Sequence, residues 1–104
     1  MNKKNKNYIV CKKICFYSQL DEDMFFLWIK SMSCVKNFYG AGDKLYIDLV
    51  NKDLDIHDMK NLIAFLYRYK IDMTQLQFFV NEKNESAAQP WKKQIYKQMI
   101  NQGK

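Results

Sequence analysis

The side chains of this sequence best suited to nucleophilic chemistry are the thiol of Cys15 and the imidazole of His57, the single histidine. A cysteine attacks as its thiolate, so a base or a positive charge must lie beside it. Cys15 lies in a segment rich in β-forming residues, whereas His57 lies near the start of a predicted helix. We therefore expect a buried strand cysteine and an exposed helix histidine. The sequence predicts no catalytic residues and a protein that is not an enzyme.

Motifs for metals and phosphates are equally weak. Asp53, Asp55 and Asp58 are spaced faintly like the start of a calcium loop, but the central glycine and the twelfth-position glutamate are missing. A single histidine and three cysteines without a Cys-x-x-Cys pair make a zinc site improbable. Gly40 and Gly42 join two predicted strands, and no helix follows them to receive a phosphate. We expect no metal site and no cofactor.

Charge is distributed unevenly along the chain, whose net charge is +6. Residues 1–17 carry five lysines and no acid, and residues 91–104 carry four lysines and no acid. Residues 18–60 carry eight acids against five lysines, while residues 61–90 are balanced. Basic ends of this kind are most often solubilising tails. A uniformly basic groove for nucleic acid would not need an acidic centre.

The stretch from Phe16 to Met32 must position the first group of acids. Ser18 has the side chain of a helix N-cap, and Asp21, three residues later, is a short version of the capping-box acid. Acids in the first turn suit the positive end of the helix dipole, so they are explained as a helix start or, on a second hypothesis, also as the rim of a binding surface. The predicted apolar stripe of this helix comprises Leu20, Met24, Trp28 and Met32, with Phe25 and Ile29 beside them.

The other elements follow from apolar spacing and turn residues. In the first half, the chain is expected to form a strand that begins at about 12 or earlier and ends at 17, a helix at 20–32, and strands at 33–39 and 44–50 joined by a glycine turn at 40–43. In the second half, we expect a helix at 56–69 capped by Asp55, a short helix at 73–80 capped by Asp72 and a loop at 81–90. A C-terminal helix follows at about 91–101, with Trp91, Ile95 and Met99 spaced by four.

This order predicts an α/β (α+β) fold with a small three-stranded mixed sheet. The element order is β-α-β-β-α-α, the first two strands are parallel through a right-handed crossover, and the helices pack on one face. Residues 1–104 form a single domain by the usual size prior, with a mobile tail at 1–7. The expected core residues are Trp28, Phe25, Ile29, Leu62, Ile63 and Leu66.

Targeting signals are not evident. No apolar run approaches the ~20 residues needed to span a bilayer. Lys12 and Lys13 interrupt what would be the apolar region of a signal peptide. The three cysteines suit free buried thiols in a reducing compartment. We therefore expect a cytoplasmic protein without a membrane partner.

Residues 14 to about 85 resemble the immunity proteins of contact-dependent growth inhibition, small bacterial cytosolic proteins of polymorphic-toxin loci. The resemblance rests on FYSQLDEDMFFLWI at 16–29, the hairpin turn with Gly40, Gly42 and Asp43, LIAFLYRYKIDMTQL at 62–76, and Phe79 to Asn84. In the family, a segment rich in tyrosine, tryptophan and histidine follows. Here Ala87 to Trp91, the lysine-rich tail and the extended basic N-terminus depart from that pattern.

The resemblance implies a non-enzymatic inhibitor whose partner is the C-terminal toxin domain of a neighbour's surface protein. Many such toxins are nucleases acting on transfer RNA, which need basic surfaces for phosphate. An inhibitor with carboxylates in place of phosphates would associate rapidly. The expected toxin-binding residues are therefore the two acidic groups, Asp21, Glu22 and Asp23, and Asp53, Asp55 and Asp58.

The net charge of +6 points the other way, because an inhibitor of a nuclease is more often acidic throughout. An acidic patch on the toxin, met by the lysine-rich tail, would reconcile the two, so Lys92, Lys93 and Lys97 are secondary candidates. The alternative function is a small nucleic-acid-binding accessory protein. In that case Tyr67, Arg68, Tyr69 and Lys70 would stack on and neutralise the nucleic acid. On the main hypothesis we expect no direct nucleic-acid partner; the oligomeric state is left open.

Overall fold

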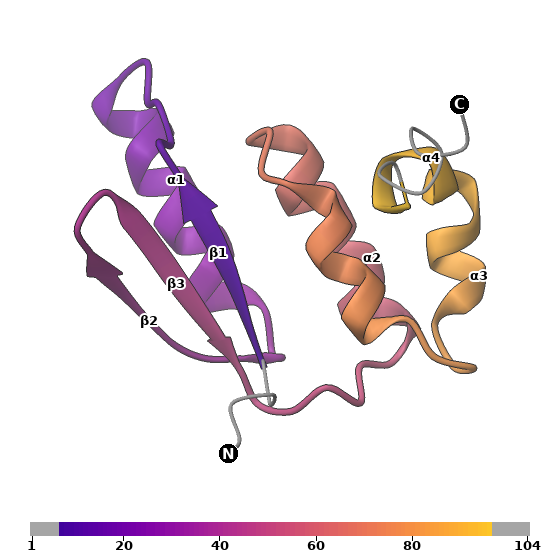
Figure 1. Cartoon of the computed structure of the whole chain (residues 1–104). Helices are drawn as coiled ribbons and strands as arrows, with labels where there is room; N and C mark the ends of the chain where they lie inside the picture. The colour runs from indigo at the N-terminus through magenta and orange to yellow at the C-terminus, as the bar shows by residue number, and fades with distance from the viewer. Residues whose placement is uncertain (1–6, 97–104) are drawn as a thin grey trace. The chain divides into compact units, whose positions relative to one another are not determined.

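The computed structural model describes residues 7–96, which belong to two compact units (Figure 1). The first unit ends at Lys52 and the second begins at Asp53, and each is described by itself. The expectation of a single domain stays a prediction. The expected mobile tail lies outside the described residues except for Asn7, whose carbonyl oxygen accepts a hydrogen bond from the Leu49 N–H at 2.7 Å. The backbone of Asn7 is therefore bonded to that of Leu49, and the mobility of the tail stays a prediction.

The first unit is a three-stranded sheet with one helix, and the α+β class is confirmed. Its elements are β1 (Tyr8–Lys12), α1 (Gln19–Ser31), β2 (Val35–Ala41) and β3 (Lys44–Leu49). The strand order is β1-β3-β2, and β3 pairs antiparallel with both neighbours (Figure 1). The expected mixed sheet is therefore wrong: β1 and β2 run in the same direction, but β3 lies between them. The tight hairpin brings β3 into that central place, where it gains two ladders of hydrogen bonds.

The first strand lies earlier in the chain than expected. Ile9 and Cys11 are buried and stand opposite Ile47 and Leu45 of β3. The alternation of buried and partly exposed side chains that marks the strand therefore begins at Tyr8. Lys13 has a φ of +50°, a left-handed conformation that ends the extended strand. The expected strand at 12–17 is therefore mostly a connection to α1.

The hairpin between β2 and β3 is confirmed. Gly42 has a φ of +66° at the turn, a conformation that glycine adopts without the steric cost of a side chain. On the sheet face opposite Ile9 and Ile47, the rings of Tyr39 and Tyr46 stack with centroids 5.3 Å apart. Such cross-strand aromatic pairs stabilise the register of an antiparallel sheet.

Helix α1 begins as expected. The Ser18 hydroxyl accepts a hydrogen bond from the Asp21 N–H at 3.1 Å. The Asp21 carboxylate in turn accepts from the Tyr17 N–H at 3.0 Å, one residue before the N-cap. Two of the backbone donors around the helix start are thus satisfied by side chains, which is why the helix begins here.

The buried face of α1 differs from the predicted stripe. Phe25, Ile29 and Met32 are buried, whereas Leu20 and Met24 are 66% and 44% exposed. Trp28 is half-buried, so its expected place in the core is wrong. Contacts between aromatic rings decide the orientation of the helix: Phe25 packs edge-on against Phe16, and Phe26 packs against Phe38 of β2, with centroids 5.1 and 5.6 Å apart.

The second unit is helical. It contains α2 (Ile56–Arg68), the 3₁₀ helix η1 (Met73–Phe79), α3 (Glu85–Ala88), the 3₁₀ turn η2 (Gln89–Trp91) and α4 (Lys92–Ile95). The expected core residues Leu62, Ile63 and Leu66 are buried. The cap at Asp72 is confirmed, since its carboxylate accepts from the Thr74 N–H at 3.0 Å.

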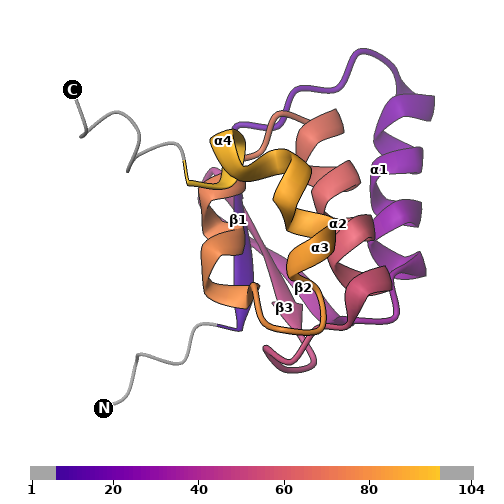
Figure 2. The same ribbon diagram turned by 90° about the vertical axis from the view of Figure 1, so that its right-hand side faces the viewer.

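The expected loop at 81–90 is wrong over its second half. Residues 85–91 are helical, and α3 packs against α2 (Figure 2). Ala87 and Ala88 are buried, and their small side chains allow a close approach of the two helices. The expected C-terminal helix begins as η2 and α4, with Ile95 buried, while Lys97, Met99 and the rest of that range lie outside the described residues.

Helix α2 ends in a Schellman motif formed without glycine. The Ile71 N–H donates to the Leu66 carbonyl at 2.8 Å, and the Lys70 N–H donates to the Tyr67 carbonyl at 3.2 Å. Lys70 has a φ of +59°, so a residue with a Cβ occupies the left-handed position. This conformation is unfavourable for lysine and ordinary for glycine.

We expect Lys70→Gly to raise the free energy of unfolding by about 0.5–1 kcal/mol, because it relieves the left-handed strain. Lys60, an exposed lysine inside the same helix, is the matched control, and Lys60→Gly should lower the free energy of unfolding by about 1 kcal/mol. Urea denaturation of both variants checks the prediction. Equal destabilisation by the two changes would contradict it.

Candidate functional site

The first acidic group lies at the start of α1 and is partly committed to forming it. Asp21 accepts from the Tyr17 N–H, and Asp23 accepts from the Gln19 side-chain amide at 3.0 Å. Asp21 and Glu22 are half-buried, and of the three only Asp23 is exposed. Within the triplet, Asp23 therefore has the freest access to a partner.

Beside Asp23 lies an apolar surface that includes Leu20 and Met24, two residues of the predicted apolar stripe. Leu20, Met24 and Leu27 are 66%, 44% and 51% exposed, and their spacing of four and three residues puts them on one side of α1. Asp23 falls on the same side, three residues after Leu20 and four before Leu27. We call these four residues the α1 strip.

A signal for this surface was present in the sequence. From Met24 to Ile29 every residue is apolar, which is more than one face of a helix can bury. A helix that is apolar on most sides must either be surrounded or leave apolar side chains in contact with water. The phase of the stripe alone could not tell which side would be buried.

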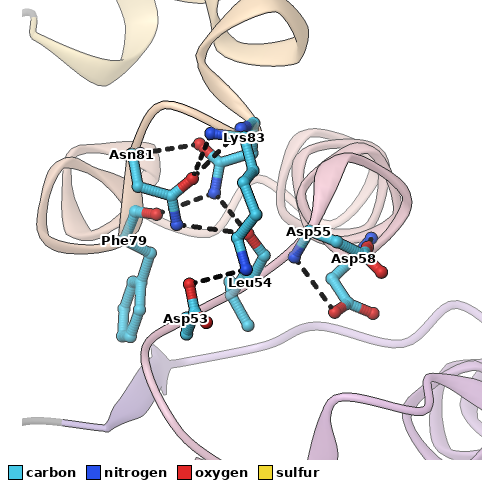
Figure 3. A network of polar contacts seen from close by, with 8 residues as sticks. Asp53, Leu54, Asp55, Asp58, Phe79, Asn81 and Lys83 are labelled. Carbon is cyan, nitrogen blue, oxygen red and sulfur yellow. Dashed lines mark hydrogen bonds and ion pairs between the residues drawn. The ribbon is translucent and has the colours of Figure 1, made fainter.

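The second acidic group lies at the start of α2 and is more fully engaged (Figure 3). Asp53 forms an ion pair with Lys83 at 2.9 Å. Asp55 and Asp58 form a reciprocal capping box: the Asp55 carboxylate accepts from the Asp58 N–H at 2.9 Å, and the Asp58 carboxylate accepts from the Asp55 N–H at 3.4 Å. These oxygens serve the helix start, as predicted for Asp55.

The capping box also lowers the pKa of Asp55 below its ordinary value of 3.8, chiefly through the hydrogen bond from the Asp58 backbone. A carboxyl with a lowered pKa contributes stability above its ordinary pKa and loses that contribution as the pH falls through the folded-state value. Asparagine offers the same capping oxygen without the charge. We therefore expect the stability difference between the wild type and Asp55→Asn to shrink when the pH falls below about 4.

Thermal unfolding of both proteins from pH 7 to pH 2 measures this difference. Asn61→Gln, a neutral change at an exposed residue of the same helix, controls for other changes with pH. A difference in melting temperature that stays constant over the whole range would show that the Asp55 charge does not contribute.

A polar network ties the segment before α2 to the segment before α3 (Figure 3). Asn84 is fully buried, and its side-chain amide donates to the carbonyls of Leu54 and Phe79, both at 2.9 Å. Its side-chain oxygen accepts from the Asn81 N–H at 2.9 Å. Asn84 thus satisfies three backbone groups at once, and this role is structural.

The cysteines are placed differently from the expectation. Cys11 and Cys34 are buried, but Cys15 is exposed and lies after the end of β1, so the expected buried strand position of Cys15 is wrong. The other half of that prediction is confirmed, because His57 is exposed on α2. Burial raises the pKa of the Cys11 thiol to about 12, which keeps it protonated at neutral pH.

Possible ligand sites in the described residues are few. A hollow of about 230 Å³ in the first unit is lined by Cys11, Phe16, Phe25 and neighbouring residues, and it is mainly apolar. Within residues 7–96, no group of three or more histidine, cysteine, aspartate or glutamate side chains is placed to hold a metal ion.

The secondary candidates Lys92 and Lys93 are exposed on α4, and Lys97 lies outside the described residues. Tyr69 packs against Phe65 with centroids 5.3 Å apart and is half-buried. Tyr67 is 58% exposed and contacts Trp91, with centroids 4.9 Å apart. Of the two tyrosines, Tyr67 is therefore the one that faces solvent.

A comparison with known protein families, curated proteins and solved structures finds no match to this chain. Among the helices of the described residues, none is long and apolar enough to cross a membrane.

Proposed function

We propose that this chain is an immunity protein that binds and neutralises the C-terminal toxin domain of a contact-dependent growth inhibition system. The toxin class we favour is a nuclease, with transfer RNA as its substrate. In this role the chain acts in the cytoplasm, by occupying a surface of the toxin and without catalysing a reaction. The resemblance of residues 14 to about 85 to such immunity proteins first suggested the hypothesis.

The observation that carries the proposal is the α1 strip. Three large apolar side chains exposed on one side of a helix are costly in water unless another molecule covers them. Anchors spaced by three, four and seven residues are the pattern with which a helix enters a hydrophobic groove of a partner protein. Leu20, Met24 and Leu27 have this spacing. A protein-binding module accounts for them directly.

Charge at the end of the strip fits a basic partner. Asp23 is exposed and Glu22 is half-buried at the positive end of α1. Carboxylates at the rim of an interface mainly accelerate association with a basic surface, such as the phosphate-binding surface of a nuclease. Asp53, Asp55 and Asp58 are a weaker second group in this proposal, because their oxygens already serve an ion pair and a helix cap.

The proposal predicts that a gene for a large secreted protein with a variable C-terminus lies next to this one, and the test uses the C-terminal domain of that protein. That domain is expressed in bacteria with and without the full chain, and growth is measured. We expect the chain to restore growth and to bind the purified domain. Inhibition of growth that the chain does not relieve, with no binding of the two purified proteins, would overturn the proposal.

Variants locate the contact. The double change Leu20→Ala and Met24→Ala should weaken binding by tenfold or more, since apolar anchors at the centre of an interface each contribute about 1–2 kcal/mol or more. The matched control is Val50→Ala and Phe78→Ala, two apolar residues that are 56% and 67% exposed elsewhere. Equal weakening by both pairs would show that the α1 strip is not the contact.

Association kinetics then separate the two charge hypotheses. Replacing Asp21, Glu22 and Asp23 with alanine should slow association with the toxin domain and make the association rate less dependent on salt, after allowance for the weakened helix start. Alanine at Lys92, Lys93 and Lys97 is the comparison. If the lysine variant abolishes binding and the acidic variant leaves rate and affinity unchanged, the basic end of the chain is the toxin-binding surface.

A further inference from the structure

Two basic segments that lie far apart in the sequence meet in the second unit. Arg68 and Lys70 stand at the end of α2, and Lys92 and Lys93 open α4. The contact between the Tyr67 and Trp91 rings, with centroids 4.9 Å apart, joins the first segment to the second. We call the six residues Tyr67, Arg68, Lys70, Trp91, Lys92 and Lys93 the basic-aromatic patch.

A second contact confirms that the segments are neighbours. Helix α4 packs against η1, which follows Lys70 after two residues. A hollow of about 230 Å³ is lined by Lys70, Ile71, Met73 and Gln94, together with Asp72. Lys70 therefore lines the same hollow as Gln94 of α4, the residue that follows Lys93.

The charge of the patch is almost wholly positive. All four cations are exposed. The carboxylate closest to Lys70 in the sequence, that of Asp72, accepts hydrogen bonds from the Thr74 N–H at 3.0 Å and the Thr74 hydroxyl at 2.7 Å. The ion pair of Lys83 with Asp53 involves none of the four cations. They therefore remain free to meet anionic groups of another molecule.

The rings decide what kind of anion fits best. Tyr67 keeps 58% of its surface exposed and Trp91 is half-buried, so neither ring is fully buried in the core. Cations around exposed aromatic rings are the combination that proteins use for single-stranded nucleic acid, in which phosphates are neutralised and unpaired bases stack on the rings. An acidic protein would use the cations but would leave the rings without stacking partners.

We propose that the basic-aromatic patch binds single-stranded RNA. Tyr67 and Trp91 stack on bases, while Arg68, Lys70, Lys92 and Lys93 contact the backbone phosphates. This departs from the expectation of no direct nucleic-acid partner, which treated the two basic segments separately. The activity is independent of the α1 strip, because the patch and the strip belong to different units and share no residue. Lys92 and Lys93 belong both to the patch and to the rival toxin-binding surface, so RNA binding is measured without the toxin.

Fluorescence anisotropy of a labelled 12-nucleotide RNA of mixed sequence, titrated with the full chain over a range of salt concentrations, tests the proposal. We expect binding that weakens steeply with salt. Replacing Lys92 and Lys93 by glutamine should reduce the slope of log K against log salt by about 1.4, which is two contacts at ~0.7 each for single strands. Lys30→Gln with Lys60→Gln removes the same charge elsewhere and should leave the slope unchanged.

The rings need a separate readout. Tyr67→Ala should weaken binding about tenfold, the effect of one stacked base, whereas Tyr17→Ala, which truncates a tyrosine that is 87% exposed in the first unit, should not. The chain has two tryptophans, so Trp28→Phe leaves Trp91 as the single reporter, and RNA should quench its fluorescence.

Each of three results would overturn the proposal: no binding at low salt, equal effects of the two lysine pairs, or unquenched Trp91 fluorescence at saturation. Poly-glutamate that competes as well as the RNA would show that the patch recognises acidic protein through charge alone. The same RNA annealed to its complement should bind more weakly, because its bases are no longer open to the rings. None of these outcomes depends on the toxin, so failure here leaves the immunity proposal standing.

Discussion

Asn84→Leu should lower the free energy of unfolding by about 2–5 kcal/mol, because it removes the partner of buried backbone groups. The wild-type amide donates to the Leu54 and Phe79 carbonyls, and its oxygen accepts from the Asn81 N–H. Leucine has a similar volume but can form none of these bonds. The Leu54 carbonyl keeps the Asn81 side-chain amide at 3.2 Å, so the loss falls mainly on Phe79 and on the Asn81 N–H.

Urea denaturation measures the effect, and Asn61→Leu is the matched control. Asn61 is exposed on α2, and the same change there should alter stability by less than about 0.5 kcal/mol. If the two leucine variants are equally stable, the hydrogen bonds of Asn84 contribute nothing beyond its volume.

Asn84→Asp provides a second test with a defined sign. The new carboxylate would be buried beside two carbonyl oxygens, so its pKa in the folded state should lie above the ordinary value. A group with a raised pKa contributes most to stability below its unfolded-state pKa, and the contribution is lost as the pH rises through the folded-state value. We therefore expect the stability of this variant, relative to the wild type, to improve as the pH is lowered from 8 to 4. A difference independent of pH would argue against a desolvated site.

Phe25→Ala should cost about 3–5 kcal/mol, the range for removing a large aromatic side chain from a core. Phe25 is fully buried, and its ring packs edge-on against both Phe16 and Phe26, with centroids 5.1 and 5.0 Å apart. Alanine would leave a cavity beside two rings that are held in place, since Phe26 also packs against Phe38 of β2. The site could therefore collapse only partly.

The informative comparison is with Leu20, on the opposite side of the same helix. Leu20→Ala should cost less than about 1 kcal/mol, because the side chain is 66% exposed and alanine is the better helix former. Trp28→Ala should fall between the two, since Trp28 is half-buried. Chemical denaturation of the three variants gives the order. A larger loss at Leu20 than at Phe25 would mean that the α1 strip is core and not a binding surface.

Helices α1 and α2 show how much of the buried core the sequence predicted. The predicted stripe and the observed buried face of α1 share Phe25, Ile29 and Met32 but differ at Leu20 and Met24. In an unbroken apolar run every side of the helix carries apolar residues, so the spacing of these residues could not show which side is buried. In α2 polar residues separate the apolar ones, and there Leu62, Ile63 and Leu66 are buried as expected.

Local chemistry was determined by the sequence itself. Ser18, Asp55 and Asp72 cap helices where predicted, because a cap needs only a short polar side chain beside free backbone N–H groups a few residues away. The glycine turn at 40–43 likewise predicts its hairpin, because Gly42 lies within those four residues and adopts the positive φ that the turn requires.

Only the tertiary structure decided the features that join distant residues. The place of β3 between β1 and β2 depends on which edge the crossover leaves free. The burial of Asn84 depends on carbonyls 5 and 30 residues away. The helical segment α3 in the predicted loop packs against α2, far from it in the sequence. The contact of Tyr67 with Trp91 turns two ordinary basic helix ends into one patch. Each of these follows from packing between segments, which the periodicity of a single segment does not encode.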